Sequence, residues 1–383
     1  MLADTIPLYA FYALLFADAG LSDRQISSLF LLWSMVGIVA EVPAGALADR
    51  FSRRAALVAS GVLQAAGYVL WIALPGYSAF AAGFVLWGLG GALGSGALEA
   101  LLYDGMASLG AESHYPRIYG RVTSMGLLSQ IPASVAAFVL FSAGGYDLVG
   151  WTSVVCCLAA AAVASRLPDV RPVAATVGHG AGVEGAGDDR TGPGYLAFLR
   201  SGLVEAASHP GVRTALVAVA LLGGLEGLEE YFPLLAHDWG VATAWVPVAV
   251  LVIPLMGAGG AALGGMATEI RPGTLAVVLG AAVALFGGVA LLSQPVGVVG
   301  IALAYGLYQL VLVVTDTRLQ QRIEGPARAT VTSVAAVGME FSAVGLYAAW
   351  ALELPVLVAA VALVMAAALP RLLRPEQRLI GQS

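Results

Sequence analysis

The sequence predicts an all-α membrane protein whose twelve transmembrane helices form two pseudo-symmetric bundles of six. Three observations lead to this fold class: an apolar composition, long apolar runs and a one-sided distribution of arginine. Hydrophobic residues make up 59% and charged residues 11% of the 383 residues, whereas soluble domains hold about half and about a quarter. The mean hydropathy is +0.87. One soluble core cannot bury this much apolar surface, but a bilayer can surround it.

The apolar runs are continuous and have about the 20 residues that an α-helix needs to cross a bilayer. Backbone groups in lipid need partners within the protein, so a spanning segment is either a helix or part of a closed barrel. Barrel strands would alternate apolar and polar residues, and these runs do not. The predicted spans are residues 2–19, 26–48, 55–75, 79–102, 120–143, 148–165, 212–236, 245–267, 274–292, 296–315, 329–350 and 354–370.

All basic residues are arginines, and their positions predict how the chain is oriented. With the N-terminus in the cytoplasm, every arginine except Arg24 falls on the cytoplasmic side, as the positive-inside rule requires. One missed or extra helix would scramble this partition. We therefore expect a multi-pass protein of the cytoplasmic membrane with both termini in the cytoplasm.

The one long polar stretch separates the two halves and is rich in glycine between Gly178 and Gly187, as a flexible linker would be. Leu196, Leu199 and Leu203 then follow at helical spacing, which predicts a short helix on the membrane surface. The predicted domains are an N-terminal six-helix bundle (1–166), a cytoplasmic linker with this interfacial helix (167–211), a C-terminal six-helix bundle (212–370) and a cytoplasmic tail (371–383).

Three short motifs recur at equivalent places in the two halves and indicate an internal repeat. They are Asp4-x-x-Pro7-Leu8 with Glu230-x-x-Pro233-Leu234, Gly45-x-x-x-Asp49 with Gly265-x-x-x-Glu269, and Val122-Thr123-Ser124 with Val331-Thr332-Ser333. Two parallel halves of this kind place a substrate site near the midplane between them. Span seven has 21 residues before Pro233, but only six precede Pro7. We therefore expect a true start upstream of Met1; the alternative is a short or tilted first span.

Residues 45–54 read GALADRFSRR and follow the second predicted span. This stretch resembles the signature G-x-L-A-D-R-x-G-R-R of the major facilitator superfamily, with Ser52 in place of one glycine. The resemblance covers essentially the whole chain and implies a secondary transporter that works by alternating access and needs no cofactor. It also implies a cytoplasmic gate, for which we expect Gly45, Asp49, Arg50, Arg53 and Arg54. A purely topological role is the alternative for the arginines.

The sequence indicates the direction of transport less clearly than it indicates the family. The element from Glu99 to Asp104, at the end of span four, is similar to bacterial exporter-like members of the family. Two motifs of drug–proton antiporters, R-x-x-x-G in span four and G-P-x-x-G-G in span five, do not occur. Export is therefore our expectation, and a nutrient importer of the same fold is the alternative.

Carboxylates inside the spans are costly unless they face a wet cavity or a partner. Glu226, Glu229 and Glu230 are three and four residues apart, so an α-helix would place them on one face of span seven. Three neighbouring carboxylates cannot all ionise cheaply, which suits a proton carrier; a water-filled vestibule without a proton role is the alternative. Asp4 and Glu340 are further candidates, and Glu340 could instead serve structural pairing.

In the family that the chain resembles, spans one, four, seven and ten line the cavity. The further candidates for contact with the substrate are therefore Tyr9, Trp87, Glu99, Tyr305 and Gln309. No basic residue lies well inside a predicted span, so we expect a neutral or cationic amphiphile and no anion. The motifs Gly90-x-x-x-Gly94 and Gly260-x-x-x-Gly264 are expected to be sites of close helix packing.

The composition also argues against other classes of protein. A Walker-type ATPase and a retinal protein each need a lysine, and the chain has none. The four histidines fall in loops or at span ends, and neither H-E-x-x-H nor G-x-S-x-G occurs, so we expect neither a metal site nor an intramembrane enzyme. A non-transporting sensor would usually carry a soluble domain. The expected partners are a small-molecule substrate, protons and the bilayer, with no nucleic acid, and the functional unit is expected to be a monomer.

Overall fold

The computed structural model describes residues 5–50, 52–94, 97–111, 114–168, 210–266, 269–323 and 328–373. Helices dominate this part of the chain, and it contains no strand, which confirms the predicted all-α class. The first group of elements comprises η2 (Pro7–Ala10), α1 (Tyr12–Asp18), α2 (Asp23–Arg50), α3 (Arg53–Ala73), α4 (Tyr77–Gly94), α5 (Ala97–Ala107) and α6 (Tyr115–Ala164). The second group comprises α8 (Pro210–Gly223), η4 (Gly224–Tyr231), α9 (Phe232–Asp238), η5 (Thr243–Trp245), α10 (Val246–Val250), α11 (Val252–Met266), α12 (Pro272–Leu292), α13 (Gly297–Arg322), α14 (Arg328–Ala351) and α15 (Pro355–Leu372).

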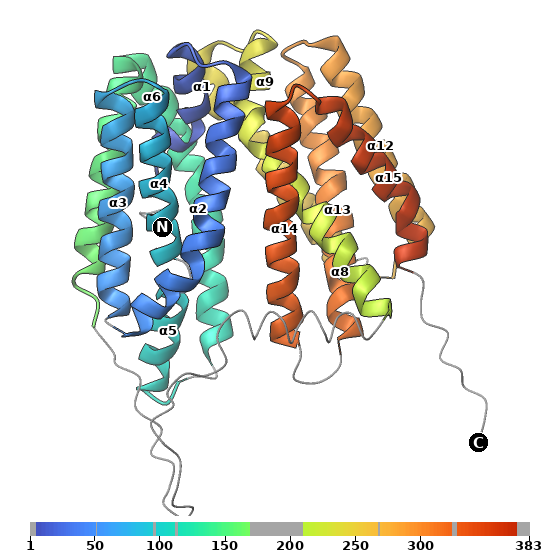
Figure 1. Ribbon diagram of the computed structural model, residues 1–383, viewed down its shortest axis with the longest axis horizontal. Coiled ribbons are helices and arrows are strands. Elements are labelled where there is room, and N and C mark those ends of the chain that lie inside the picture. The colour runs from blue at the N-terminus through green and yellow to red at the C-terminus, as the bar shows by residue number, and fades with distance from the viewer. Residues whose placement is uncertain are drawn as a thin grey trace, which may run out of the picture.

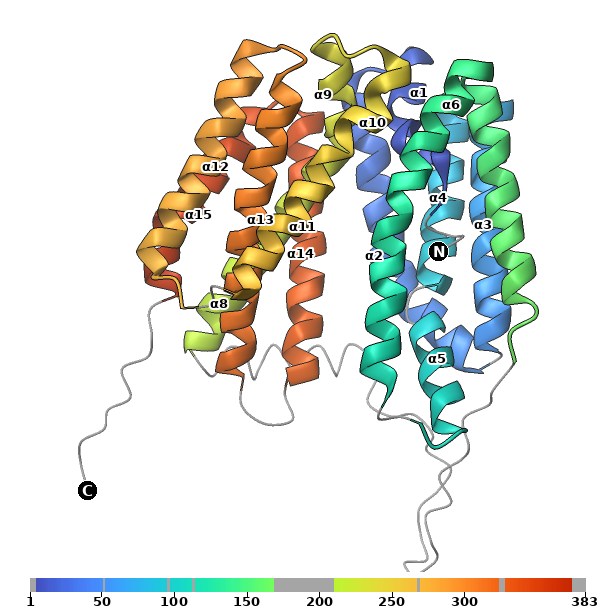
Figure 2. The ribbon, with the colours of Figure 1, turned by 180° about the vertical axis from the view of Figure 1, so that it is seen from behind.

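The two groups stand side by side with their helices roughly parallel (Figure 1). We call the end where α1 and α9 lie the α9 end, and the opposite end, where α5 lies, the α5 end. The groups meet where α2 packs against α14, where α1 meets α9, and where η5 and α10 pack against α6 (Figure 2). The predicted division into two bundles and a linker stays a prediction, since nearly all of the linker lies outside the described residues.

Eight described helical segments are long and apolar enough to cross a membrane. One of them, Arg117–Ala164, has 48 residues, or about 70 Å of helix against the ~30 Å of a bilayer core. It reverses at Gly144 and Gly145, where the backbone leaves the helical region and Gly145 has a φ of 61°. This reversal falls in the predicted gap between spans five and six. The other predicted spans coincide with η2–α1, α2 and α15, so the structure is consistent with twelve crossings.

Small residues allow the helices of each group to approach closely. A Cβ on Gly260 would overlap the carbonyl oxygen of Gly306, so α11 and α13 lie nearly backbone to backbone. In the first group, a Cβ on Gly94 would come within 2.9 Å of the Ser60 hydroxyl. In lipid, burial of apolar surface contributes little to the association of helices, so such close packing is what holds them together. The prediction for both glycine motifs is confirmed.

Aromatic side chains fill the core of the first group. Tyr12, Phe16, Trp71 and Phe84 are buried and pack edge to face or tilted, with ring centroids 4.9–5.9 Å apart. The indole of Trp71 donates a hydrogen bond of 3.1 Å to the carbonyl of Phe80. These rings fix α1 against α3 and α4. They therefore set the position of η2, which carries Tyr9.

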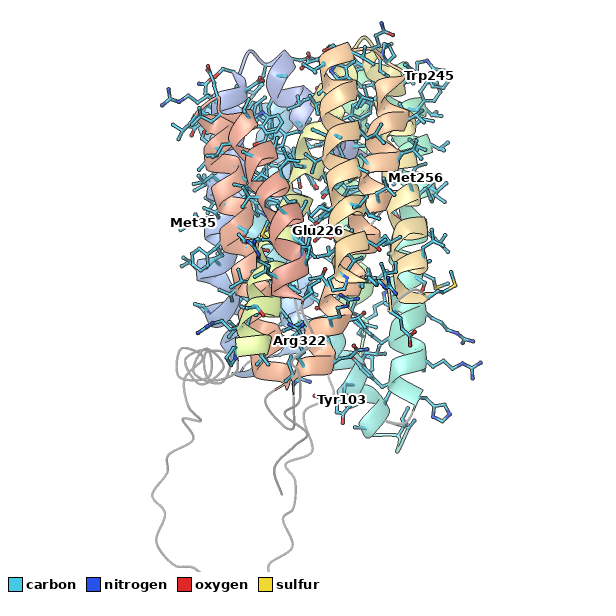
Figure 3. All side chains as sticks on the ribbon, turned by 90° about the vertical axis from the view of Figure 1, so that its right-hand side faces the viewer. Met35, Tyr103, Glu226, Trp245, Met256 and Arg322 are labelled. Atoms are coloured by element: carbon cyan, nitrogen blue, oxygen red, sulfur yellow. The ribbon has the colours of Figure 1, made fainter. Side chains whose placement is uncertain are left out.

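Arginines satisfy carbonyl groups at the α5 end. Arg322, at the last turn of α13, donates to the carbonyl oxygens of Gly211 at 2.7 Å and Leu372 at 3.2 Å, near the ends of α8 and α15 (Figure 3). Arg318 donates to the carbonyl of Ile270. These contacts tie α13 to the ends of α8 and α15 and to the segment before α12 at this end.

Candidate functional site: a cavity between the two helix groups

A cavity of about 920 Å³, open space at its mouth included, lies between the two helix groups. It is lined from the first group by η2, α1 and α6, and from the second group by η4, α9, α10 and α11. The polar lining residues are Tyr9, Tyr12, Gln130, Ser134, Glu229 and Glu230. The rest of the described lining is apolar, and it includes Pro7, Pro233 and Pro254. We call this space the central cavity.

Span seven is interrupted where it reaches the central cavity. The α-helix α8 gives way to the eight-residue 3-10 helix η4, which contains Glu226, Glu229 and Glu230, and continues as α9. Gly224 permits this path, because a Cβ there would lie within 3 Å of the α14 backbone at Ser342 and Ala343. A 3-10 stretch within a longer helix often marks a functional hinge, and broken helices line the binding sites of many carriers. Glu226 lies near mid-height of the molecule (Figure 3).

The 3-10 geometry corrects the expected arrangement of the three carboxylates. An α-helix would place all three on one face, but a 3-10 helix has three residues per turn, so only residues three apart are aligned. Glu226 and Glu229 therefore share a face, and Glu230 points about a third of a turn away. The reason that the prediction failed is tertiary: η4 packs tightly against α14, where a Cβ on Gly227 would come within 3.0 Å of the Tyr347 hydroxyl.

Two residues of α13 bind the two aligned carboxylates. The Gln309 amide donates to Glu226 Oε1 at 3.0 Å and to the Tyr305 hydroxyl at 2.7 Å, and that hydroxyl donates to Glu229 Oε1. The result is one chain of hydrogen bonds, Glu226–Gln309–Tyr305–Glu229, which we call the acid chain. Tyr305 and Gln309 were predicted to contact substrate. The structure places them behind η4, where they hold the acids.

Glu230 lies on the cavity side of η4 and faces the first group. Tyr9 is 48% exposed and lies within electrostatic reach of both Glu230 and Glu229. Its ring packs against Tyr12, with centroids 5.7 Å apart, and against Trp87, at 6.1 Å. Trp87 thus lies behind Tyr9, and it is not among the described residues that line the cavity. The wall opposite the acids is therefore aromatic.

The other predicted site residues are distributed as follows. Asp4 lies outside the described residues, and Glu99 belongs to α5 but its side chain is not described. Glu340 is exposed on α14 and is close enough to Glu41 of α2 to interact with it electrostatically. Glu340 is thus at the contact between the two groups and apart from the described acid chain.

The predicted gate motif spans the end of α2 and the start of α3. The helix α2 extends to Arg50, so Gly45, Asp49 and Arg50 belong to its last turns and not to a loop; their side chains are outside the described part. Ser52 caps α3 by accepting a hydrogen bond from the Ala55 amide at 3.0 Å. An N-cap side chain of this kind explains why serine fits where the signature has glycine.

The two arginines that follow are anchored within the first group. Arg53 pairs with Asp104 of α5 and donates to the carbonyl of Ala100 at 2.9 Å. Both paired side chains are 17% exposed. Arg54 donates to the carbonyl of Leu167 at 3.4 Å, beyond the end of α6. These contacts join α3, α5 and the end of α6 at the α5 end.

A buried hydrogen bond between the two groups was not predicted. The Tyr231 hydroxyl donates to Ser27 Oγ at 2.9 Å, and these residues are 1% and 0% exposed. The Tyr231 ring also stacks on Trp350, at 4.2 Å, and packs edge to face on Phe30, at 5.5 Å. No sequence signal identifies Ser27, because serines near the start of a span are common. Tyr231 is notable because it directly follows Glu230.

This hydrogen bond and a second contact join the two groups near the α9 end. Phe138 of α6 packs on Trp245 of η5, with ring centroids 4.4 Å apart. We call the Ser27–Tyr231 hydrogen bond the α9-end latch. Within the described residues, no three histidine, cysteine, aspartate or glutamate side chains come close enough to hold a metal ion. The site is thus a cavity with carboxylates on one wall and aromatic rings on the other.

Two helix groups around such a cavity are an arrangement that many membrane carriers share, and comparison with known proteins places the chain in a family of that kind. The family model of the Major Facilitator Superfamily matches residues 1–347. The chain belongs to this superfamily. No curated protein matches the sequence.

Several solved structures share the fold. The nucleoside transporter NupG aligns with a TM-score of 0.70 at 9% identity, over 98% of this chain and 100% of that one. A bacterial homolog of the human lysosomal transporter Spinster, inward-facing and occupied, gives 0.68 at 17% identity, over 97% and 93%. A D-xylose-proton symporter gives 0.63 at 15%, over 98% and 95%. At these identities, the similarity shows the fold alone.

Proposed function

We propose that the chain is a proton-coupled secondary transporter that works by alternating access and exports a neutral or cationic small amphiphile. The observation that carries this proposal is the position of Glu229 and Glu230 on an interrupted transmembrane helix, in the wall of the central cavity. Carboxylates at membrane depth that face a cavity are typical of proton pathways in carriers.

The acid chain supports proton coupling. Hydrogen bonds link Glu226 to Glu229 through Gln309 and Tyr305, so a proton that leaves one carboxylate alters the partners of the other. Glu230 is not one of the links and faces the cavity. We assign Glu230 the role of exchanging protons with the cavity. We assign the acid chain the role of transmitting the charge state of Glu230 to α13.

The lining of the cavity supports the proposed substrate class. Its described lining contains two carboxylates and no arginine or histidine, so its field repels phosphates and carboxylates. Tyr9 and Tyr12 present aromatic rings opposite these carboxylates, and aromatic faces attract organic cations. The proline and aliphatic residues of the remaining wall suit an apolar portion of the same molecule.

The rest of the proposal concerns the membrane, the oligomeric state and the orientation of the carrier. We place it in the cytoplasmic membrane as a monomer, with the α5 end and both termini in the cytoplasm. The substrate and protons are its only expected partners besides the bilayer. Two six-helix bundles, 1–166 and 212–370, would then move against each other around the central cavity.

The test uses the purified protein in proteoliposomes that enclose a pH-sensitive dye. Cationic, neutral and anionic compounds, such as tetraphenylphosphonium, an uncharged aromatic amine and glycerol phosphate, are added outside. Entry by proton antiport alkalinises the lumen, as expected for an exporter, and symport acidifies it, which would identify the importer alternative. Saturable transport of glycerol phosphate, or substrate transport with no proton flux, would overturn the proposal.

A further inference from the structure

A second cavity lies inside the second helix group, on the far side of η4 from the first group. It is bounded by η4, α9, α12, α13 and α15 and holds about 730 Å³, open space at its mouth included. Phe232 lines both this space and the central cavity. We call this space the rear cavity.

The described wall of the rear cavity has almost no polar group to which a water molecule could form a hydrogen bond. Thirteen of its fifteen described lining residues are apolar or glycine, and the other two are Tyr305 and Tyr308. Both hydroxyls are already engaged, that of Tyr305 with Glu229 and that of Tyr308 with the carbonyl of Leu222 at 2.7 Å. A buried water needs two to four polar partners, so it gains little by entering. The rear cavity is suited to hydrocarbon.

Small side chains create the space and its entrance. Ala282, Ala304 and Ala362 lie in the wall and are 4–6% exposed. Gly287 of α12 and Ala359 of α15 are lining residues that are exposed at the surface. These two helices form the outer edge of the second group (Figure 1). At Gly287 and Ala359 the cavity therefore comes nearest to the bilayer interior, where the available molecules are apolar.

We propose that the rear cavity is a binding site for an uncharged hydrocarbon group, either the acyl chain of a bilayer lipid or the apolar part of a small hydrophobe. The group enters between α12 and α15 and lies against Phe232 and the ring of Tyr305. An empty cavity of this size would lose dispersion contacts along its whole lining, and an occupant restores them. The occupant thereby supports the residue that binds Glu229, from the side opposite the central cavity.

The test is photolabelling of the full-length protein in lipid nanodiscs. One arm uses a phosphatidylcholine with a diazirine in its acyl chain, and the other uses a small aromatic diazirine, so the two sources of hydrocarbon are distinguished. Labelled residues are identified by mass spectrometry. We expect insertion at lining residues of α12 and α15 in at least one arm.

Two variants from different helices narrow the rear cavity, Ala282→Leu and Ala362→Leu. A leucine side chain adds three carbons that occupy the space of the bound hydrocarbon, so labelling of the lining should be largely lost in both variants. The matched control is Val277→Leu, which is on the outer face of α12, where Val277 is 71% exposed; labelling of the lining should not change in this control. Elution as a single monodisperse species verifies that each variant is folded.

Two results would overturn the proposal. One is wild-type protein that is labelled in both arms only on its outer faces, which would mean that no hydrocarbon enters. The other is labelling of the lining that both narrowed variants retain at the wild-type level. Neither result depends on transport, so the proposal stands or falls separately from the proposed function.

Discussion

The α9-end latch makes a quantitative prediction about the conformational equilibrium of the carrier. The substitution Tyr231→Phe removes one hydroxyl and leaves the aromatic stacking on Trp350 in place. Ser27 is fully buried, so it loses its 2.9 Å partner without access to water. Its own hydroxyl can still donate to a carbonyl one turn earlier in α2, so the serine is not left without any partner. We expect a cost of about 1–2 kcal/mol to the state in which this end is closed.

That cost corresponds to a roughly five- to thirtyfold shift toward conformations in which the α9 end is open. Spin labels at Ser22 and Leu352 would report it, because these residues are exposed beside the α9-end termini of α2 and α14. Cys156 and Cys157, the native cysteines, are replaced by alanine in every sample. Double electron–electron resonance in nanodiscs then measures how much of the long-distance population is present.

A double-mutant cycle distinguishes the hydrogen bond from a general loss of packing. Ser27→Ala combined with Tyr231→Phe removes both polar partners and leaves no buried group unpaired, so its distance distribution should return close to that of the wild type. If Tyr231→Phe leaves the distribution unchanged, or if the double variant is shifted as far as the single one, the latch does not control this end.

Three further predictions concern coupling, packing and orientation. Glu230→Gln should abolish accumulation driven by a pH gradient in proteoliposomes while counterflow exchange continues; full accumulation in Glu226→Gln, Glu229→Gln and Glu230→Gln alike would remove the proton role of η4. Gly260→Ala should lower the free energy of unfolding by about 1–3 kcal/mol, because its Cβ overlaps the Gly306 carbonyl. The same change at Gly259, which has nothing within 4 Å, should not, and equal melting temperatures would contradict the packing argument. A reporter fused after Ser383 and a tag inserted near Gly185 should both be cytoplasmic, and a periplasmic signal from either would contradict the orientation that we propose.

The sequence determines the helices of this fold more fully than it determines the site. The bilayer acts on each segment separately, and it imposes both the apolar runs and the positive-inside asymmetry. These two signals correctly placed a loop at the reversal of Gly144 and Gly145. Glycines spaced by four also predicted close packing, because an absent side chain is itself the signal. These features depend on neighbouring residues in the chain, so one amino-acid sequence is enough to predict them.

The features that were missed depend on contacts between distant segments. The 3-10 form of η4 follows from tight packing on α14, and nothing in the local pattern of Glu226, Glu229 and Glu230 indicates it. The bond between Ser27 and Tyr231 joins residues 204 positions apart. The rear cavity likewise arises from small residues on three helices whose alignment the sequence does not state.

The helical form of η4 gives span seven a mechanical property. Eight residues of 3-10 helix rise about 16 Å, and the same residues in an α-helix rise about 12 Å. Rewinding would therefore shorten span seven by about 4 Å and rotate its two ends against each other by about 160°. That rotation would align Glu230 with Glu226 and draw Tyr231 along the helix axis, away from Ser27. A single change from 3-10 to α-helical winding would thus rotate the Glu230 carboxylate away from the cavity and separate Tyr231 from Ser27 in the same movement.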